Sequence, residues 1–170
     1  MGIAQYLLAF QMAAFALPAA ALEALRANAS VAFLGLHFID TSTEGAYNGV
    51  RADEAARMDL LRALIVSRFQ DEGFRFLDLT PVQAEIDSVV NPANCYGCEL
   101  RIAAKLDADY VLIGEVQKVS NLILSMNLVM KDVADKMAVR ARSVEIRANT
   151  DASWLRGMRY ILKTHYFREN

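Results

Sequence analysis

Two cysteines, Cys95 and Cys98, form the sharpest chemical feature of this 170-residue sequence. Their CxxC spacing suits a disulfide, a redox-active pair or two of the four ligands of a zinc site. A thioredoxin-like redox site would need a cis-proline, but no proline follows Pro92. A zinc site would need His37 and His165, the only histidines, to converge from distant parts of the chain. We therefore expect a structural disulfide, and the redox-active and metal-binding interpretations stay open as alternatives.

His37 lies in the apolar segment 31–40, on the side that a regular strand would share with Phe33, Gly35 and Ile39. A histidine in such a segment is more often a hydrogen-bonded core residue than a ligand or a base. The sequence contains no G-x-S-x-G nucleophile motif and neither of the glycine-rich phosphate-binding patterns, GxGxxG and GxxxxGK[ST]. We therefore expect no enzymatic activity, no catalytic residues, no metal site and no cofactor.

Polar side chains alternate with apolar ones along residues 122–130, which is typical of a strand with one buried face. The predicted buried stripe consists of Leu122, Leu124, Met126, Leu128 and Met130. Ser125 and Asn127 point the other way, and Glu115 and Gln117 of the preceding predicted strand belong to the same outward face. Such a face is usually solvated, but an exposed sheet face or edge can also receive a partner strand. Glu115, Gln117, Ser125 and Asn127 are therefore candidate partner-binding residues.

Asp40 and Glu44 lie at and just after the carboxyl end of the first predicted strand. Open α/β sheets often bind ligands at the carboxyl ends of their strands, so both residues are further candidates for partner binding. Acidic residues in a loop are usually only solvated, and that interpretation competes with binding.

The periodicity of the apolar residues predicts the elements that carry these side chains. Strands are expected at 31–40, 74–79, 109–119, 122–130 and 137–148, and helices at 51–72, 82–90, 92–106 and 151–167. The segment 41–48 is a predicted loop. The resulting order, β-α-β-α-α-β-β-β-α, indicates an α/β fold with helices packed on a mixed five-stranded sheet. A composition of 55% hydrophobic and 22% charged residues fits one compact domain of this kind.

The amino-terminal segment is typical of a secretory signal peptide, because it is apolar and uncharged before Glu23. Small residues follow Pro18, which predicts cleavage that leaves residues 1–21 as the signal peptide and 22–170 as a single domain. The usual positively charged start is missing, and an uncleaved membrane anchor is the alternative. We expect a periplasmic protein with no membrane span after cleavage.

The second half of the chain carries a resemblance to known proteins. Residues 95–133 read CYGCELRIAAKLDADYVLIGEVQKVSNLILSMNLVMKDV, and residues 142–162 read RSVEIRANTDASWLRGMRYIL. Together they resemble a family of proteobacterial exported proteins whose function has not been assigned. The element order, in which DYVLIGEV enters a strand meander, also resembles the TolB amino-terminal domain and CsgG-like envelope proteins at the level of the fold.

This resemblance implies an envelope protein that contacts other proteins, and it supplies no catalytic residues. The net charge of −2 lacks the basic excess that binding to phosphates requires, so we expect no nucleic-acid partner. The sequence therefore predicts a non-enzymatic periplasmic binding or assembly module whose partner is another envelope protein. A thiol-disulfide or metal-handling accessory protein built on Cys95 and Cys98 is the alternative.

Overall fold

The computed structural model describes residues 24–167, and the predicted signal peptide at 1–21 lies outside this range. The elements of this part of the chain are β1 (Ser30–Asp40), α1 (Thr43–Asn48), α2 (Ala52–Asp71), β2 (Arg75–Phe76), α3 (Gln83–Asp87), α4 (Cys98–Ala104), β3 (Tyr110–Ser120), β4 (Ile123–Asp132), β5 (Ala138–Arg147) and α5 (Asp151–Ile161). Short helical segments add Thr80–Val82, Pro92–Asn94 and Leu162–Tyr166. The predicted order is confirmed, with the short helix α1 added where the sequence predicts a loop. None of the helices within residues 24–167 is both long and apolar enough to cross a membrane.

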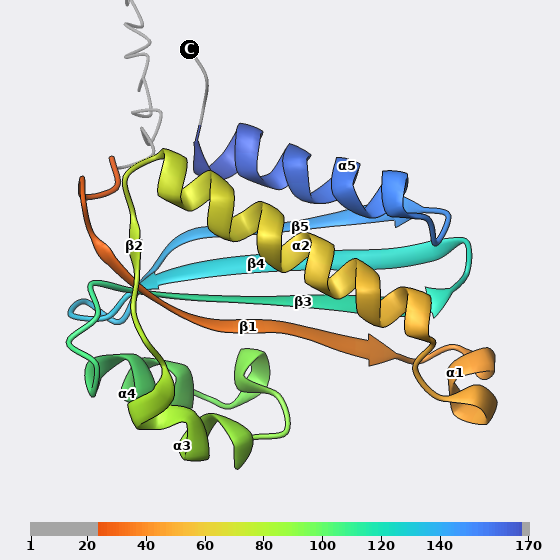
Figure 1. The fold of residues 1–170 in the computed structure, drawn as a ribbon, viewed down its shortest axis with the longest axis horizontal. Helices are drawn as coiled ribbons and strands as arrows, with labels where there is room; N and C mark the ends of the chain where they lie inside the picture. The colour runs from red at the N-terminus through yellow and green to blue at the C-terminus, as the bar shows by residue number, and fades with distance from the viewer. Residues whose placement is uncertain (1–23, 168–170) are drawn as a thin grey trace, which may run out of the picture.

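The strands form one mixed sheet in the order β2-β1-β3-β4-β5, which confirms the predicted α/β fold. β1 runs parallel to β2 and β3, whereas β3, β4 and β5 form an antiparallel meander. β2, at one edge of the sheet, is two residues long. β5, at the other edge, is ten residues long. Figure 1 shows the long strands side by side, with α2 and α5 crossing the same face of the sheet.

α2 and α5 pack over this face of the sheet and bury the larger of two cores. The buried apolar residues of α2 recur at spacings of three and four, as the sequence predicts, and are Met58, Leu61, Ile65 and Phe69. The sheet contributes the predicted stripe of β4, which consists of Leu124, Met126, Leu128 and Met130, all at 0% exposure. The inclusion of Leu122 in that stripe is wrong, because this residue lies in the turn before β4 and is 70% exposed.

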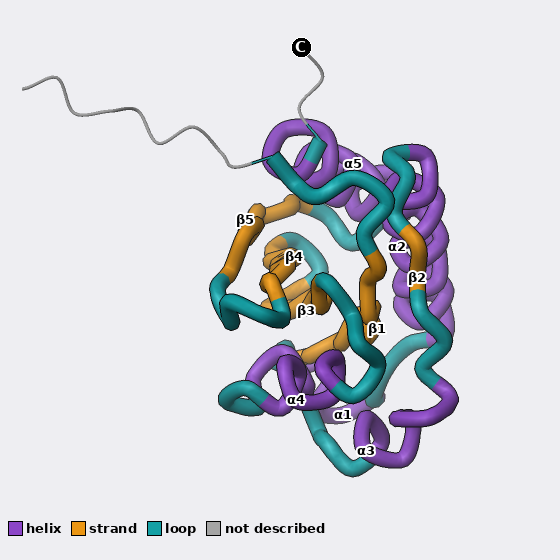
Figure 2. Tube along the Cα trace, turned by 90° about the vertical axis from the view of Figure 1, so that its left-hand side faces the viewer, coloured by secondary structure: helices purple, strands orange, loops and turns teal. Residues whose placement is uncertain are grey.

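α3 and α4 cover the opposite face, but only over the half near the start of β1 and β3; Figure 2 shows them across the sheet from α2 and α5. The smaller core contains Ala32 and Leu34 of β1, Val111 and Ile113 of β3, and Ile102 of α4. Residues further along the same face, among them Ile39, Gln117 and Ser125, belong to neither core. This face of the sheet is therefore only half covered by the described helices.

A β-bulge interrupts β1 between Phe33 and Leu36. Gly35 in this bulge has a φ of 101°, a conformation that residues with side chains rarely adopt. The extra residue shifts the alternation, so that Phe33 and Leu36 both face the larger core. The expectation that His37 shares a face with Phe33 is wrong, because regular alternation fails at the bulge. His37 pairs instead with Glu115 of β3 on the half-covered face.

The predicted helix at 92–106 is interrupted. Asn91 caps a single helical turn by accepting a hydrogen bond from the backbone N–H of Ala93. Tyr96 and Gly97 then have φ values of 52° and 95°, so a right-handed helix cannot run through them. α4 begins afresh at Cys98. An Asn-Pro pair starts a short turn and a long helix equally well, which is why the pattern does not reveal the break.

Candidate functional site

The four candidate residues of the meander lie together on the half-covered face of the sheet. Strand register places Glu115 opposite Asn127 and Gln117 opposite Ser125. All four side chains are partly exposed. The neighbouring strands extend these two rows of side chains. We call this surface the open face; it consists of His37, Ile39, Glu115, Gln117, Ser125, Asn127, Ser143 and Glu145.

A pocket of about 340 Å³ lies where the open face meets the segment before α4, and Glu115 and Asn127 both line it. Oε2 of Glu115 accepts a hydrogen bond of 2.9 Å from Nδ2 of Asn91. Across the pocket, Nζ of Lys131 lies 2.7 Å from Oε1 of Glu99, whose side chain is buried. Both carboxylates of this pocket therefore already have partners within the protein, and the freely accessible part of the open face lies beyond the pocket.

Cys95 and Cys98 form a disulfide beside this pocket, with their Cα atoms 5.5 Å apart. Together with Glu99, they are the one group of cysteine, histidine and acidic residues within residues 24–167 that is compact enough for a metal ion. The disulfide engages both sulfurs, and Oε2 of Glu99 lies 3.1 Å from Sγ of Cys95. A carboxylate at this distance opposes the negative charge that a leaving thiolate develops. The arrangement therefore suits a structural link better than thiol-disulfide exchange.

His37, at the inner end of the open face, is not arranged as a catalytic base. Burial, together with the nearby Arg62, lowers the pKa of His37 below its ordinary value, so the imidazole is neutral at neutral pH. Its Nε2 atom is buried and has no hydrogen-bond partner among the described residues. A base that activates a nucleophile needs that nucleophile within hydrogen-bonding distance, and none is placed there in residues 24–167.

Asp40, the last residue of β1, and Glu44, in α1, both contact Lys118 of β3. Nζ of Lys118 lies 3.2 Å from Oδ2 of Asp40, 3.0 Å from Oε2 of Glu44 and 2.7 Å from Oε1 of Glu54. The side chains of Lys118 and Glu54 are 0% exposed, and that of Asp40 is 6% exposed. The two acidic residues that the sequence offers to a partner therefore already bind a buried cation of the protein itself.

The contacts around Lys118 join elements that are distant in the sequence. Oε1 of Glu54, in α2, also accepts a hydrogen bond of 2.7 Å from Nδ2 of Asn149, which precedes α5. Oδ1 of Asn149 accepts a hydrogen bond of 2.9 Å from the indole N–H of Trp154, and Trp154 is fully buried. We call this cluster the Lys118 network; it consists of Asp40, Glu44, Glu54, Lys118, Asn121 and Asn149.

Protonation of the network follows from these contacts. Burial disfavours the charged form of Asp40, but hydrogen bonds from Ser42 and Lys118 outweigh this effect and lower the pKa of Asp40. Hydrogen bonds from Lys118 and two further side chains lower the pKa of Glu44. Burial opposes the charge of Lys118, but the three surrounding carboxylates outweigh it and raise the pKa of this lysine. Asp40, Glu44 and Lys118 are therefore all charged at neutral pH.

Sequence reasoning missed Lys118, although the alternation of β3 contains the relevant pattern. Period two places Lys118 on the same face as Leu112, Gly114 and Val116, all of which are buried. A lysine at such a position needs an anionic partner, because an unpaired charge in a core is strongly unfavourable. The carboxylate that ends β1 is one such partner, and its role is internal.

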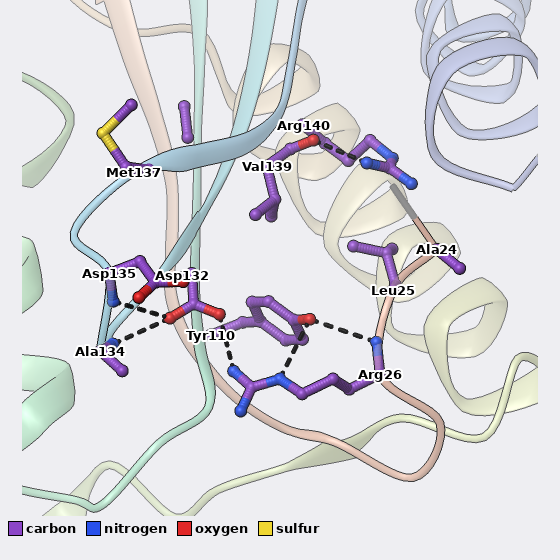
Figure 3. Close-up of a pocket in the computed structure, with 11 residues that line it drawn as sticks. Ala24, Leu25, Arg26, Tyr110, Asp132, Ala134, Asp135, Met137, Val139 and Arg140 are labelled. Carbon is purple, nitrogen blue, oxygen red and sulfur yellow. Dashed lines mark hydrogen bonds and ion pairs between the residues drawn. The ribbon is translucent and has the colours of Figure 1, made fainter. Parts of the chain in front are cut away.

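A larger pocket of about 630 Å³ lies near the start of the described chain (Figure 3). Figure 3 shows Arg26 extending past Tyr110 toward Asp132. Nη2 of Arg26 lies 2.8 Å from Oδ2 of Asp132, Nη1 lies 3.1 Å from Oδ1 of Asp109, and Nε donates to the Tyr110 hydroxyl at 3.3 Å. Arg26 therefore already pairs with two carboxylates of the protein itself. These contacts fasten the segment before β1 to β3 and β4.

Comparison of the sequence with curated proteins found no match. Among solved structures, the chain is similar to the LpoB C-terminal domain from Salmonella enterica, with 14% identity, a TM-score of 0.49 and coverage of 72% of this chain and 85% of that one. It is similar to the lipoprotein GNA1162 from Neisseria meningitidis, with 14% identity, a TM-score of 0.45 and coverage of 72% and 83%. It is also similar to PelC from Paraburkholderia phytofirmans, solved as a dodecamer, with 14% identity, a TM-score of 0.44 and coverage of 84% of this chain and 91% of that one.

Residues 29–166 match a protein family over nearly the whole of the described range. The matched range contains the disulfide, the Lys118 network and the open face. This family match also confirms the expected resemblance to a family without an assigned function. The chain therefore belongs to the family described as "Protein of unknown function (DUF2380)".

Proposed function

We propose that this protein is a non-enzymatic binding or assembly module of the cell envelope, which acts in the periplasm through protein–protein contacts on its open face. The observation that carries the proposal is the unequal cover of the two sheet faces. α2 and α5 bury one face, whereas Gln117 and Ser125 on the other face remain partly exposed. Val119 and Ile123, at the end of the β3–β4 hairpin, add apolar side chains that are 49% and 45% exposed. A mixed polar and apolar surface is compatible with a non-obligate protein interface, because such interfaces are about as apolar as the rest of a protein surface.

The periplasmic location rests on the amino-terminal segment and on the cysteines. An apolar start followed by small residues supports export, and a disulfide suits an oxidising compartment. Intact-mass measurement of the protein recovered from the periplasm tests this part of the proposal, with an expected first residue near Leu22. A cytoplasmic protein that retains Met1 would contradict it.

The open face is tested by placing a bulky charge at its centre. Ser125→Arg introduces this charge, and Ser67→Arg is the matched control because Ser67 is an exposed serine on α2. The tagged proteins are cross-linked in intact envelopes, isolated and compared for the partners that they retain. We expect Ser125→Arg, and likewise Glu115→Arg, to lose a partner that Ser67→Arg keeps, while all variants unfold at similar temperatures.

Equal recovery of that partner by all three folded variants would contradict a binding role for the open face. The site would then move to the segment 40–48, where Glu44 keeps 28% of its side chain exposed.

A further inference from the structure

The free edge of β5 borders the open face, with which it shares Ser143 and Glu145, and extends beyond it to α5. β5 pairs with β4 on one side, and no strand within residues 24–167 pairs with its other side. A groove of about 530 Å³ follows this edge. It is lined by residues 142–147 of β5 and by Ser153, Arg156, Gly157 and Tyr160 of α5. Because consecutive residues of one strand line the groove, the unpaired backbone groups of that strand lie within reach of an occupant.

The packing of α5 on the sheet gives this groove a fixed wall. Gly157 allows a close approach, since a Cβ atom at this position would lie 2.6 Å from Cγ2 of Ile146. The hydroxyl of Ser153 donates to the carbonyl oxygen of Arg147 at 2.8 Å and so ties the first turn of α5 to the end of β5. Ile146 is buried and Val144 is half-buried, which holds this part of β5 against the core. The strand edge and the helix therefore present a groove that exists before any partner arrives.

The residues that line the groove also carry a net positive charge. Arg142, Arg147 and Arg156 line it, against a single carboxylate from Glu145. Among the ion pairs of residues 24–167, none includes any of these three arginines. Other arginines, such as Arg57 of α2, bind a neighbouring aspartate. Three arginines without an ion pair in the described part of the chain therefore line the groove beside the free edge of β5.

We propose that this groove binds an extended acidic segment of a partner protein, which adds to the sheet as a further strand beside β5. This inference rests on the proposed binding function and names the chemistry of one partner. Backbone hydrogen bonds to β5 hold the segment, and acidic side chains at alternate positions meet Arg142 and Arg156 on the α5 side. A second copy of this protein is a poor occupant, because pairing two β5 edges brings arginines close to arginines.

Fluorescence anisotropy with two labelled probe peptides tests this proposal. One probe alternates glutamate with valine, and the other alternates lysine with valine. We expect the purified protein to bind the acidic probe and not the basic one. The double variant Arg142→Glu, Arg156→Glu should weaken binding of the acidic probe by about tenfold or more, since two charge contacts become repulsive. Arg101→Glu is the matched control, because Arg101 is exposed on α4 and away from the groove.

Hydrogen exchange of the unmodified protein locates the bound probe without any substitution. We expect the acidic probe to slow exchange of backbone amides within residues 142–147. Failure of the acidic probe to bind, equal binding of both probes, unchanged affinity of the folded double variant, or protection confined to other strands would each overturn the proposal.

Vesicles containing phosphatidylglycerol separate a protein partner from an anionic membrane. We expect the double variant and the unmodified protein to bind these vesicles equally weakly. Vesicle binding that depends on Arg142 and Arg156, without binding of the acidic probe, would assign the groove to lipid and overturn the proposal. If the partner that depends on Ser125 is still recovered from envelopes, only this inference fails and the proposed function stands.

Discussion

Replacing Lys118 with methionine removes one charge from the centre of a buried cluster while keeping an unbranched side chain there. Glu54 is 0% exposed and Asp40 is 6% exposed, so the variant leaves buried carboxylates without their cation. Breaking a buried ion pair by removing one partner costs about 3 to 5 kcal/mol. Small domains are stable by about 5 to 15 kcal/mol, so Lys118→Met should remove a large part of the free energy of unfolding at neutral pH.

Denaturant unfolding followed by circular dichroism measures this change. Lys105→Met is the matched control, because the Lys105 side chain is 56% exposed and pairs with Glu85 at the surface. The control should change the free energy of unfolding by less than about 1 kcal/mol. Adding Glu54→Gln to Lys118→Met removes one uncompensated charge and should restore part of the loss.

The pH dependence gives a second, independent check on Lys118→Met. In the folded protein the pKa values of Asp40 and Glu44 lie below their ordinary values, so their stabilising effect is present above a pH of about 4 and is lost as the pH falls through the folded values. In Lys118→Met, Glu44 keeps its ion pair with Arg51, but Asp40 loses its contact with Lys118, so protonation of Asp40 relieves part of the penalty. The stability difference between variant and wild type should therefore shrink in acid. A loss below about 1 kcal/mol at neutral pH, or a deficit that does not shrink in acid, would refute this reasoning.

Three other perturbations test the fold around these sites. Leu128→Ala should lower the free energy of unfolding by about 2 to 5 kcal/mol, whereas Ser125→Ala should change it by less than about 0.5 kcal/mol. Equal denaturant midpoints of the two variants would contradict the assignment of the two faces of β4. Gly35→Ala should cost about 1 to 3 kcal/mol, because alanine must adopt a φ near 101°; an unchanged thermal midpoint would show that the bulge accepts a side chain. Cys95 and Cys98 should resist alkylation in non-reduced periplasmic extract and react after reduction, and ready labelling before reduction would argue against the disulfide.

Periodic patterns predicted the long elements correctly because those elements bury one continuous face. The apolar spacing of α2 and the alternation of β4 each repeat over several turns or residue pairs, so single exceptions do not hide them. Short irregular features escaped for the opposite reason. The bulge at Gly35 lies in a run that is apolar on both sides, where a shift in alternation leaves no trace in residue type. The break at Tyr96 depends on a backbone conformation that the residue type does not indicate.

Predicting the site required knowledge of contacts between distant parts of the chain. Alternation within two adjoining strands predicts that four side chains share an outward face: Glu115, Gln117, Ser125 and Asn127. The register of β3 and β4 places these side chains next to one another. The inward role of Asp40 could not be inferred in the same way. Lys118 and its nearest carboxylate are 64 residues apart, and their contact depends on how α2 crosses the sheet. A pattern along one strand indicates that a lysine is buried, but only the fold selects its partners.

Because the bulge at Gly35 adds one residue to β1, a related chain whose first strand alternates regularly must be aligned to this one with a one-residue gap at that position. Without the gap, residues 36–40 would be matched to positions whose side chains lie on the opposite face of the sheet. Core residue Leu36 would be compared with a surface position, and Asp40 with a residue of the open face. Substitution profiles from such an alignment would then mix the two faces at every position from the bulge to the end of β1.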